Sequence, residues 1–217
     1  MKSILTIDVL LREAALFSAA ESTHDEPALF GVTDGKAVGT YLEHKFVAHL
    51  MDQYSFIGGN SASGIDIPSI NVDIKVTSVR QPQSSSPFKS ARQKIYGLGY
   101  SLVVFVYDKK DDSELRTGRL TMQHTIFIHK EQTGDYQMTR GLRQILENDG
   151  NKDDLIAFMK DKNLPIDDIE ADNIADVLLR QKPEQGYLTI SNALQWRLQY
   201  GRVIQQAGVV EGVLQIT

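Results

Sequence analysis

Apolar side chains recur at four-residue spacing in one stretch near the N-terminus: Val38, Leu42, Phe46 and Leu50. This period predicts an amphipathic helix from about residue 34 to residue 53. An earlier helix is predicted over residues 3–21, where charged residues interrupt an apolar stretch that would otherwise resemble a signal peptide. The chain therefore begins with two helices.

A different period follows in the middle of the chain. Residues 70–77 alternate between apolar and polar side chains, which is the pattern of a strand with one buried face. Residues 102–107 form a short apolar run rich in β-branched residues, as expected of a central strand. Residues 120–129 predict another strand. The middle of the chain is therefore expected to form a sheet.

Beyond about residue 139 the pattern becomes helical. Helices are predicted over residues 139–148, 152–162, 166–181 and 189–206, and an edge strand over the apolar residues 209–216. This order predicts an α/β fold with a central mixed β-sheet flanked by helices and a helical C-terminal third.

The amino-acid composition excludes only a few classes of protein and of functional site. A length of 217 residues fits one domain over residues 1–217, and contents of 41% hydrophobic and 24% charged residues are ordinary for a globular protein. No apolar run approaches the roughly 18 residues that span a membrane. The absence of cysteine excludes disulfides, thiolate metal sites and cysteine nucleophiles. A cytoplasmic protein without a membrane partner is expected.

The net charge of −5 argues at first against a nucleic-acid partner. The charges are segregated, however, because basic residues dominate between residues 75 and 110 and acidic residues between 149 and 176. The basic middle of the chain can therefore still bind a polyanion such as a nucleic acid. The alternative is that both stretches are solvated faces.

The stretch between residues 64 and 75 carries the candidate chemistry. Pro68 and Ser69 are predicted to form the two-residue turn of a β-hairpin. Proline suits such a turn, and a helix could not continue through it. In that register Ile67 faces Ile70, and Asp66 faces Asn71.

One face of the predicted hairpin then carries Asp66, Asn71, Asp73 and Lys75. Asp66 and Asp73 would be diagonal neighbours, roughly 7–8 Å apart at the backbone. Two such carboxylates can close on one divalent cation, which activates water and screens a phosphate. A lysine beside them can orient that water or help to deprotonate it. This set suits the hydrolysis of a phosphodiester.

Asp66, followed after six residues by Asp73-Ile74-Lys75, resembles the PD-(D/E)xK nuclease superfamily, especially type II restriction endonucleases. The order of a helix near residues 93–96 and a strand over residues 102–107 matches that family. The resemblance covers about residues 35–130, the expected catalytic core. One departure is that Ile65, rather than proline, precedes Asp66.

The resemblance implies a restriction-endonuclease-like core that cuts double-stranded DNA at a specific sequence with Mg²⁺, or with Mn²⁺ as a substitute. Asp66 and Asp73 would bind the metal and Lys75 would act on water. Glu43, on the helix ahead of the motif, would be a further catalytic residue and metal ligand. A palindromic target would imply a homodimer, since twofold symmetry of the DNA is matched by twofold symmetry of the protein.

Two further segments are candidates for DNA contact. Ser85, Lys89, Arg92 and Gln93 follow the motif strand and could hold phosphates, or could belong to a solvated loop and a helix cap. The predicted helix over residues 189–206 carries amide and guanidinium groups suited to base edges: Asn192, Gln195, Arg197, Gln199, Arg202 and Gln205. A polar helix face explains them equally well. The extension from about residue 139 to 217 could recognise DNA, dimerise or only support the core.

Other interpretations stay open at this point. Asp73 and Lys75 could form a surface ion pair, which contributes little to stability, and Asp66 could serve only the turn. A structure-specific repair or recombination nuclease would use the same chemistry but would ignore intact duplex. A non-catalytic module binding DNA or protein would not need both acids and the lysine.

Overall fold

The computed structural model describes residues 2–59, 64–191 and 197–217. The chain divides into two compact units. Unit 1 comprises Met1–Ser84, Ser101–Ile128 and Ala207–Thr217, and unit 2 comprises Ser85–Tyr100 and His129–Gln206. Each unit has a hydrophobic core of its own.

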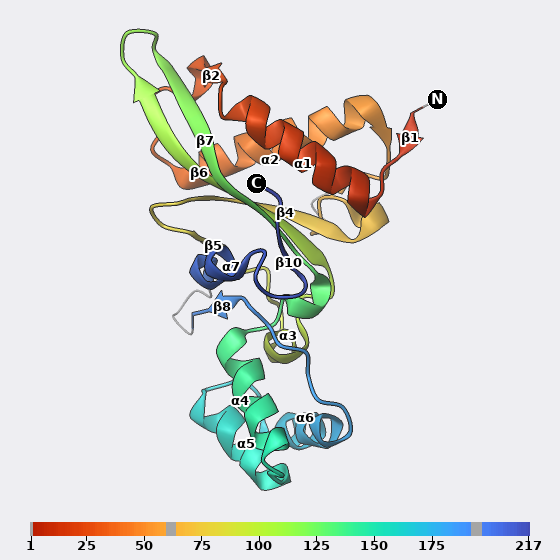
Figure 1. Cartoon of the computed structure of the whole chain (residues 1–217). Helices are drawn as coiled ribbons and strands as arrows, with labels where there is room; N and C mark the ends of the chain where they lie inside the picture. Colours follow the sequence, from red (N-terminus) through yellow and green to blue (C-terminus); the bar gives the residue numbers. More distant parts are fainter. Residues whose placement is uncertain (1, 60–63, 192–196) are drawn as a thin grey trace. The chain divides into compact units, whose positions relative to one another are not determined.

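Unit 1 is built on a mixed β-sheet (Figure 1). Its path runs β10 (Val213–Gln215), β7 (Thr117–Ile128), β6 (Ser101–Asp112), β4 (Val72–Ser78), and β2 (Asp25–Glu26) also pairs with β7. β4 is parallel to β6, whereas the other pairs are antiparallel. β4 therefore lies at one edge of this path, beside the buried central strand β6.

Two long helices, α1 (Ile7–Glu21) and α2 (Gly35–Gln53), pack on one face of this sheet (Figure 1). Aromatic rings join the layers, because the Phe46 ring on α2 lies 4.9 Å from Phe17 on α1 and 5.0 Å from Phe105 on β6, between ring centroids. Rings at such separations add to the stabilisation that comes from burial alone. This core fixes α2 against β4 and β6.

Short elements complete unit 1. β1 (Ser3–Ile4) pairs in parallel with β3 (Tyr54–Ser55). Two 3-10 turns, η1 (Pro27–Leu29) and η2 (Pro68–Ile70), each begin at a proline, which is preset for the first position of such a turn. β5 (Gln83–Ser85) lies where the chain passes from unit 1 into unit 2.

Unit 2 is mainly helical. Four helices contribute to its core: α3 (Ala91–Tyr96), α4 (Tyr136–Glu147), α5 (Lys152–Asp161) and α6 (Asp168–Arg180). Its other elements are η3 (Lys130–Gln132), the antiparallel pair β8 (Thr189–Ile190) and β9 (Arg197–Gln199), and α7 (Gly201–Gln206).

Asp135 connects three segments of unit 2. Its buried carboxylate accepts hydrogen bonds from the backbone N–H groups of Met138, at 2.9 Å, and Ile190, at 3.0 Å. Its own N–H donates to the carbonyl oxygen of Lys94 at 2.8 Å. The first bond caps α4 and the others tie it to α3 and β8, so the start of α4 is firmly placed within the unit.

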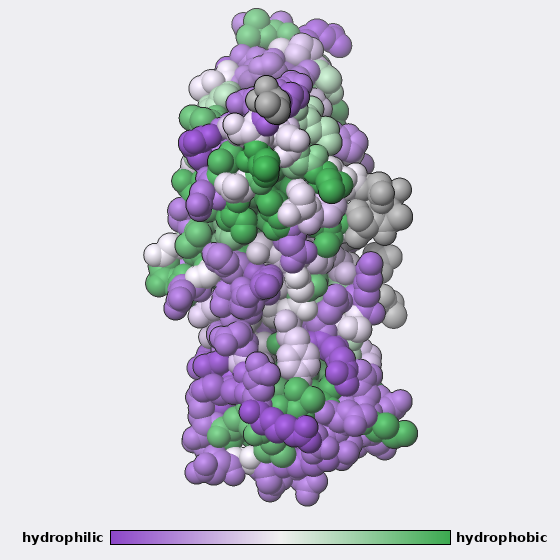
Figure 2. Space-filling model, turned by 90° about the vertical axis from the view of Figure 1, so that its right-hand side faces the viewer, coloured by the Kyte–Doolittle hydropathy of each residue, from purple (hydrophilic) through white to green (hydrophobic). Residues whose placement is uncertain are grey.

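Figure 2 shows one face of the molecule, on which hydrophobic residues gather mainly over unit 1 and hydrophilic residues predominate over unit 2. Ile4 on β1 and Leu16 on α1 are among the large apolar side chains of unit 1 that are exposed. Among the described residues, no helix is long and apolar enough to cross a membrane.

The hydrophobic patterns predicted most elements correctly. The mixed α/β class, the two N-terminal helices, the central strands, the helices between residues 139 and 181 and the edge strand near the C-terminus are confirmed. The predicted helix over residues 189–206 is wrong, because β8 and β9 pair there, and among the described residues of this range only Gly201–Gln206 is helical. Leu198 and Tyr200 are buried between exposed neighbours, which is the period of a strand. Asn192 and Gln195 lie outside the described residues.

The aromatic contacts of α2 give a stability prediction. Phe46 is fully buried, so Phe46→Ala should lower the free energy of unfolding by about 3–5 kcal/mol, the usual cost of removing a buried ring. Leu16→Ala, on the exposed face of α1, should change it by no more than about 0.5 kcal/mol. Urea unfolding followed by circular dichroism measures both. Equal effects of the two substitutions would show that this core does not hold α2.

Candidate active site

A short turn sets the register of the candidate site. η2 begins at Pro68, and Asn71 ends it in the left-handed conformation with φ of 57°, which asparagine tolerates better than most residues. Ile67 and Val72 then exchange two backbone hydrogen bonds, of 3.0 and 3.2 Å. The predicted two-residue turn is therefore wrong. The loop contains four residues, and Ile67 faces Val72 rather than Ile70.

This register brings the two aspartates closer together than predicted. One step beyond the Ile67–Val72 pair, Asp66 stands opposite Asp73 instead of opposite Asn71, which belongs to the turn. The N–H of Asp66 donates to Asp73 Oδ1 at 3.3 Å, and Asp66 Oδ2 accepts from the N–H of Ile74 at 2.8 Å. Residues that follow a hydrogen-bonded antiparallel pair have Cα atoms only about 4.5 Å apart.

The two faces of β4 differ as the sequence predicted. Ile74 and Val76 enter the core of unit 1, whereas Asp73 and Lys75 project from the other face. Asp73 is only 3% exposed and Lys75 is half-buried. The pair is therefore not an ordinary surface ion pair, because Asp73 is shielded from solvent.

Lys75 lies against the buried carboxylate. Its Nζ is 2.5 Å from Asp73 Oδ2 and donates a hydrogen bond to the carbonyl oxygen of Ile74 at 3.1 Å. This short charged contact is the partner of Oδ2, and contacts of this kind are among the stronger polar interactions in proteins.

Burial and crowding of like charges perturb this cluster. Burial raises the pKa of Asp73; the positive charge of Lys75 opposes this shift, and Asp66 adds to it. Burial likewise raises the pKa of Glu43 on α2 to about 7, opposed by Lys75 and reinforced by Asp66 and Asp73. Glu43 therefore lies within electrostatic reach of the other three predicted site residues.

The donor set can be compared with the needs of a magnesium ion. Mg²⁺ is usually held by one or two carboxylates, with water and substrate phosphate completing its shell. Asp66 and Asp73 provide such a pair, and Asp73 Oδ2 is held by Lys75 rather than by a backbone N–H group. No group of three His, Cys, Asp or Glu residues in the described part of the chain could hold a metal. The geometry thus fits an open two-carboxylate site, with Glu43 near it.

The residues predicted to contact DNA after the motif strand have contacts of their own. Gln93 Oε1 accepts from the backbone N–H of Lys89 at 2.6 Å, which caps the start of α3. Arg92 Nε donates to Glu170 Oε1 on α6 at 3.1 Å. Ser85 is exposed at the end of β5. A role of Ser85, Lys89, Arg92 and Gln93 in DNA binding stays a prediction.

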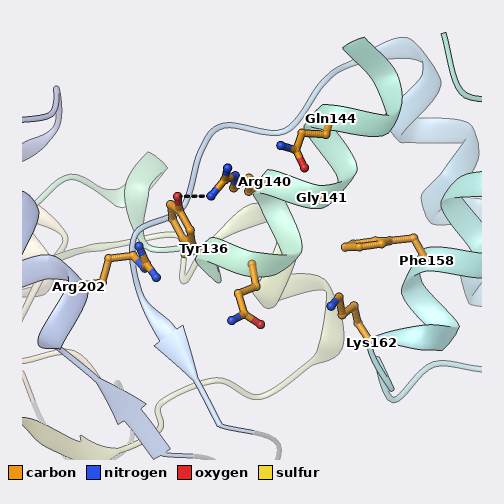
Figure 3. A pocket seen from close by; sticks show the side chains of 8 residues that line it. Tyr136, Arg140, Gly141, Gln144, Phe158, Lys162 and Arg202 are labelled. Carbon is orange, nitrogen blue, oxygen red and sulfur yellow. Dashed lines mark hydrogen bonds between the residues drawn. The ribbon is translucent and has the colours of Figure 1, made fainter. Parts of the chain in front are cut away.

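Sequence reasoning missed a hollow of about 350 Å³ in unit 2 (Figure 3). The hollow lies beside α4 and has Arg140, Lys162 and Arg202 among its lining residues, together with two aromatic rings. Of these residues only Arg202 drew attention in the sequence, as part of a predicted helix over residues 189–206 of which α7 is the helical portion among the described residues. A signal was available in the spacing of Gln137, Arg140 and Gln144, which places them in one row of α4.

Comparison with known proteins agrees with this chemistry. The family model described as "Type II restriction enzyme NspV" matches residues 4–215. The curated protein of the same name from Nostoc sp. is 67% identical over 214 residues, covering 99% of this chain and 97% of the relative. No solved structure matches. The chain belongs to the NspV family of type II restriction enzymes.

Proposed function

We propose that this type II restriction enzyme hydrolyses phosphodiester bonds of double-stranded DNA at a specific sequence, through a Mg²⁺ site of the PD-(D/E)xK kind. One observation supports this most strongly. The Ile67–Val72 pairing sets Asp66 opposite Asp73, with Lys75 beside them on the same face of β4. A helix carrying Glu43 ahead of the hairpin, and β6 parallel to β4, agree with a restriction-endonuclease-like core.

Asp66 and Asp73 are the proposed metal ligands. Backbone N–H groups engage Asp66 Oδ2 and Asp73 Oδ1, which orients both carboxylates. The other two oxygens, Asp66 Oδ1 and Asp73 Oδ2, would bind the cation, and Lys75 would give up its contact with Asp73 Oδ2. When bound, Mg²⁺ makes a coordinated water more acidic and neutralises charge on the phosphate, and Mn²⁺ could take its place. The protein's contribution is a preformed pair of ligands, Asp73 on β4 and Asp66 on the segment before the turn η2.

Lys75 is the proposed partner of the attacking water and of the phosphate. Its ammonium is held by the carbonyl oxygen of Ile74 and by the charge of Asp73, so its position is fixed before DNA arrives. A fixed cation stabilises negative charge that develops on a phosphate more effectively than mobile solvent does. The same group can orient a water molecule for attack.

Glu43 is the proposed fourth member of the site. Its pKa of about 7 means that it exchanges a proton near neutral pH, which suits a group that accepts a proton from water or joins the metal shell. Its place on α2 depends on the aromatic core around Phe46, which packs this helix on the sheet.

The cleavage assay tests the site as a whole. With Mg²⁺, the enzyme should cut unmethylated phage DNA into discrete fragments. Asp73→Ala and Lys75→Ala should each lower the rate by about 10²–10⁴-fold, the usual loss when a positioned charged or proton-transferring group is removed. Asp52→Ala and Lys36→Ala, exposed on α2, are matched controls that should leave the rate unchanged. Full activity of folded Asp73→Ala would refute the assignment.

The raised pKa of Glu43 predicts how stability depends on pH. The pKa of Glu43 in the folded protein, about 7, exceeds the ordinary glutamate pKa of 4.5, so the folded protein binds more protons than the unfolded chain between these pH values. This group therefore destabilises the metal-free fold as pH rises through that range. Glu43→Gln should therefore raise the melting temperature at pH 8 and have little effect at pH 4.5. Thermal unfolding in EDTA measures this, and an equal effect at both pH values would contradict the assigned cause.

The proposed palindromic target calls for a homodimer, because each copy would then cut one strand of a twofold-symmetric site. Light scattering coupled to gel filtration should give about twice the chain mass of 24.3 kDa, at least when a duplex is bound. A mass of one chain per duplex during cleavage of both strands would contradict the homodimer.

A further inference from the structure

Helix α4 presents two contrasting faces. Met138, Thr139 and Leu142 are buried against the core of unit 2. On the other face, Gln137, Arg140 and Gln144 are exposed at positions i, i+3 and i+7, which places them in one row along the helix. The outward row therefore consists of two amides and one guanidinium, with no apolar or acidic side chain between them.

The hollow beside this row is cationic and aromatic. Its described lining residues include no carboxylate: Tyr136, Gln137, Arg140, Gly141, Gln144, Phe158, Lys162 and Arg202. In a chain of net charge −5, three cations around one hollow are a local concentration of positive charge. Such a surface favours contact with phosphate.

Aromatic rings hold these cations in place (Figure 3). The guanidinium of Arg202 lies 3.7 Å from the centroid of the Tyr136 ring, and Lys162 Nζ lies 5.6 Å from that of Phe158. Arg140 donates a hydrogen bond to the Tyr136 hydroxyl at 3.1 Å. Cations stacked on rings lose less freedom when they bind a ligand, because their positions are already restricted.

Two details indicate that the hollow is adapted to a ligand. Arg202 Nε is buried and has no hydrogen-bond partner among the described residues, so one donor in the wall lacks an acceptor. At Gly141 a Cβ atom would lie 2.0 Å from the Phe158 ring. Any larger residue would therefore displace that ring and change the hollow, which explains a glycine in the middle of α4 despite its cost to helix stability.

We propose that α4 reads the DNA sequence, with Gln137, Arg140 and Gln144 contacting base edges in the major groove. Arginine pairs with guanine O6 and N7, and glutamine pairs with adenine N6 and N7, through two hydrogen bonds each. The major groove admits one α-helix, and 12 residues extend about 18 Å, enough to meet several base pairs. This inference rests on the proposed action on double-stranded DNA.

Lys162 and Arg202 have a different part in this arrangement. They flank the row from the end of α5 and from α7, and they point cations at the hollow rather than lying along α4. They contact backbone phosphates, which position the helix without carrying sequence information. Substitutions in the α4 row should therefore weaken binding only to the preferred DNA sequence, whereas substitution of Lys162 or Arg202 should weaken binding to any sequence.

Binding assays that do not need cleavage test the inference. Duplexes bound by Lys75→Ala in Ca²⁺ are selected from a random-sequence library, and fluorescence anisotropy then compares the selected duplex with a scrambled one. In the same background, Arg140→Ala and Gln144→Ala should each weaken binding to the selected duplex about 10- to 100-fold, the discrimination of a paired base contact. Their affinity for the scrambled duplex should stay nearly unchanged.

Two further variants distinguish the loss of a base contact from the loss of a phosphate contact or of a positive charge. Lys162→Ala should weaken binding to both duplexes equally and lower the slope of log affinity against log salt by about one. Arg180→Ala, exposed at the end of α6, removes the same charge as Arg140→Ala and should leave selectivity unchanged. Circular dichroism verifies that each variant is folded.

The inference is overturned if folded Arg140→Ala and Gln144→Ala keep the wild-type ratio of affinities for the two duplexes. Equal losses on both duplexes overturn it as well, because α4 would then bind only the backbone. Failure of the proposed function is a separate result. An enzyme that binds the selected duplex selectively but never cuts it in Mg²⁺ would refute the catalytic assignment while supporting α4 as the reading helix.

Discussion

The two hydrogen bonds between Ile67 and Val72 are the constraint on which the proposed active site depends. They set Asp66 opposite Asp73, and the alternation of β4 then places Lys75 on the same face while Ile74 enters the core. A slip of one residue would move the whole set to the other face, so the buried apolar residues also hold the charged ones in register. Parallel pairing with the buried strand β6 fixes β4 itself.

Two buried aspartates, Asp135 and Asp73, have different surroundings in this chain. Both carboxylate oxygens of Asp135 accept hydrogen bonds from backbone N–H groups, so that residue holds α4 and β8 in place. Asp73 Oδ2 instead contacts the ammonium of Lys75, and the carboxylate of Asp73 lies beside that of Asp66. Such an arrangement costs stability in the free protein and suits a divalent cation, because the cation would satisfy both carboxylates together. The burial and crowding of acidic groups around Asp73 are therefore consistent with a functional role.

Local patterns in the sequence predicted much of this architecture, and non-local contacts account for what they missed. Alternation identified the faces of β4, and with them Asp73 and Lys75. The register was missed because it depends on the left-handed conformation of Asn71, which hydrophobic periodicity does not report. The pairing of β8 with β9 was missed because a strand needs a distant partner, whereas a polar segment can resemble a helix. The approach of Glu43 to the other acids depends on how α2 packs against the sheet, so sequence alone left it as an expectation.

The position of the metal ion is the most direct test of the account. Crystals of Lys75→Ala with its selected duplex and Mn²⁺ would show the ion by anomalous scattering at the manganese edge. The account predicts an anomalous peak bound by the carboxylates of both Asp66 and Asp73, beside a phosphate of the DNA. A catalytic ion held by other residues, with Asp73 still facing only its protein neighbours, would contradict it.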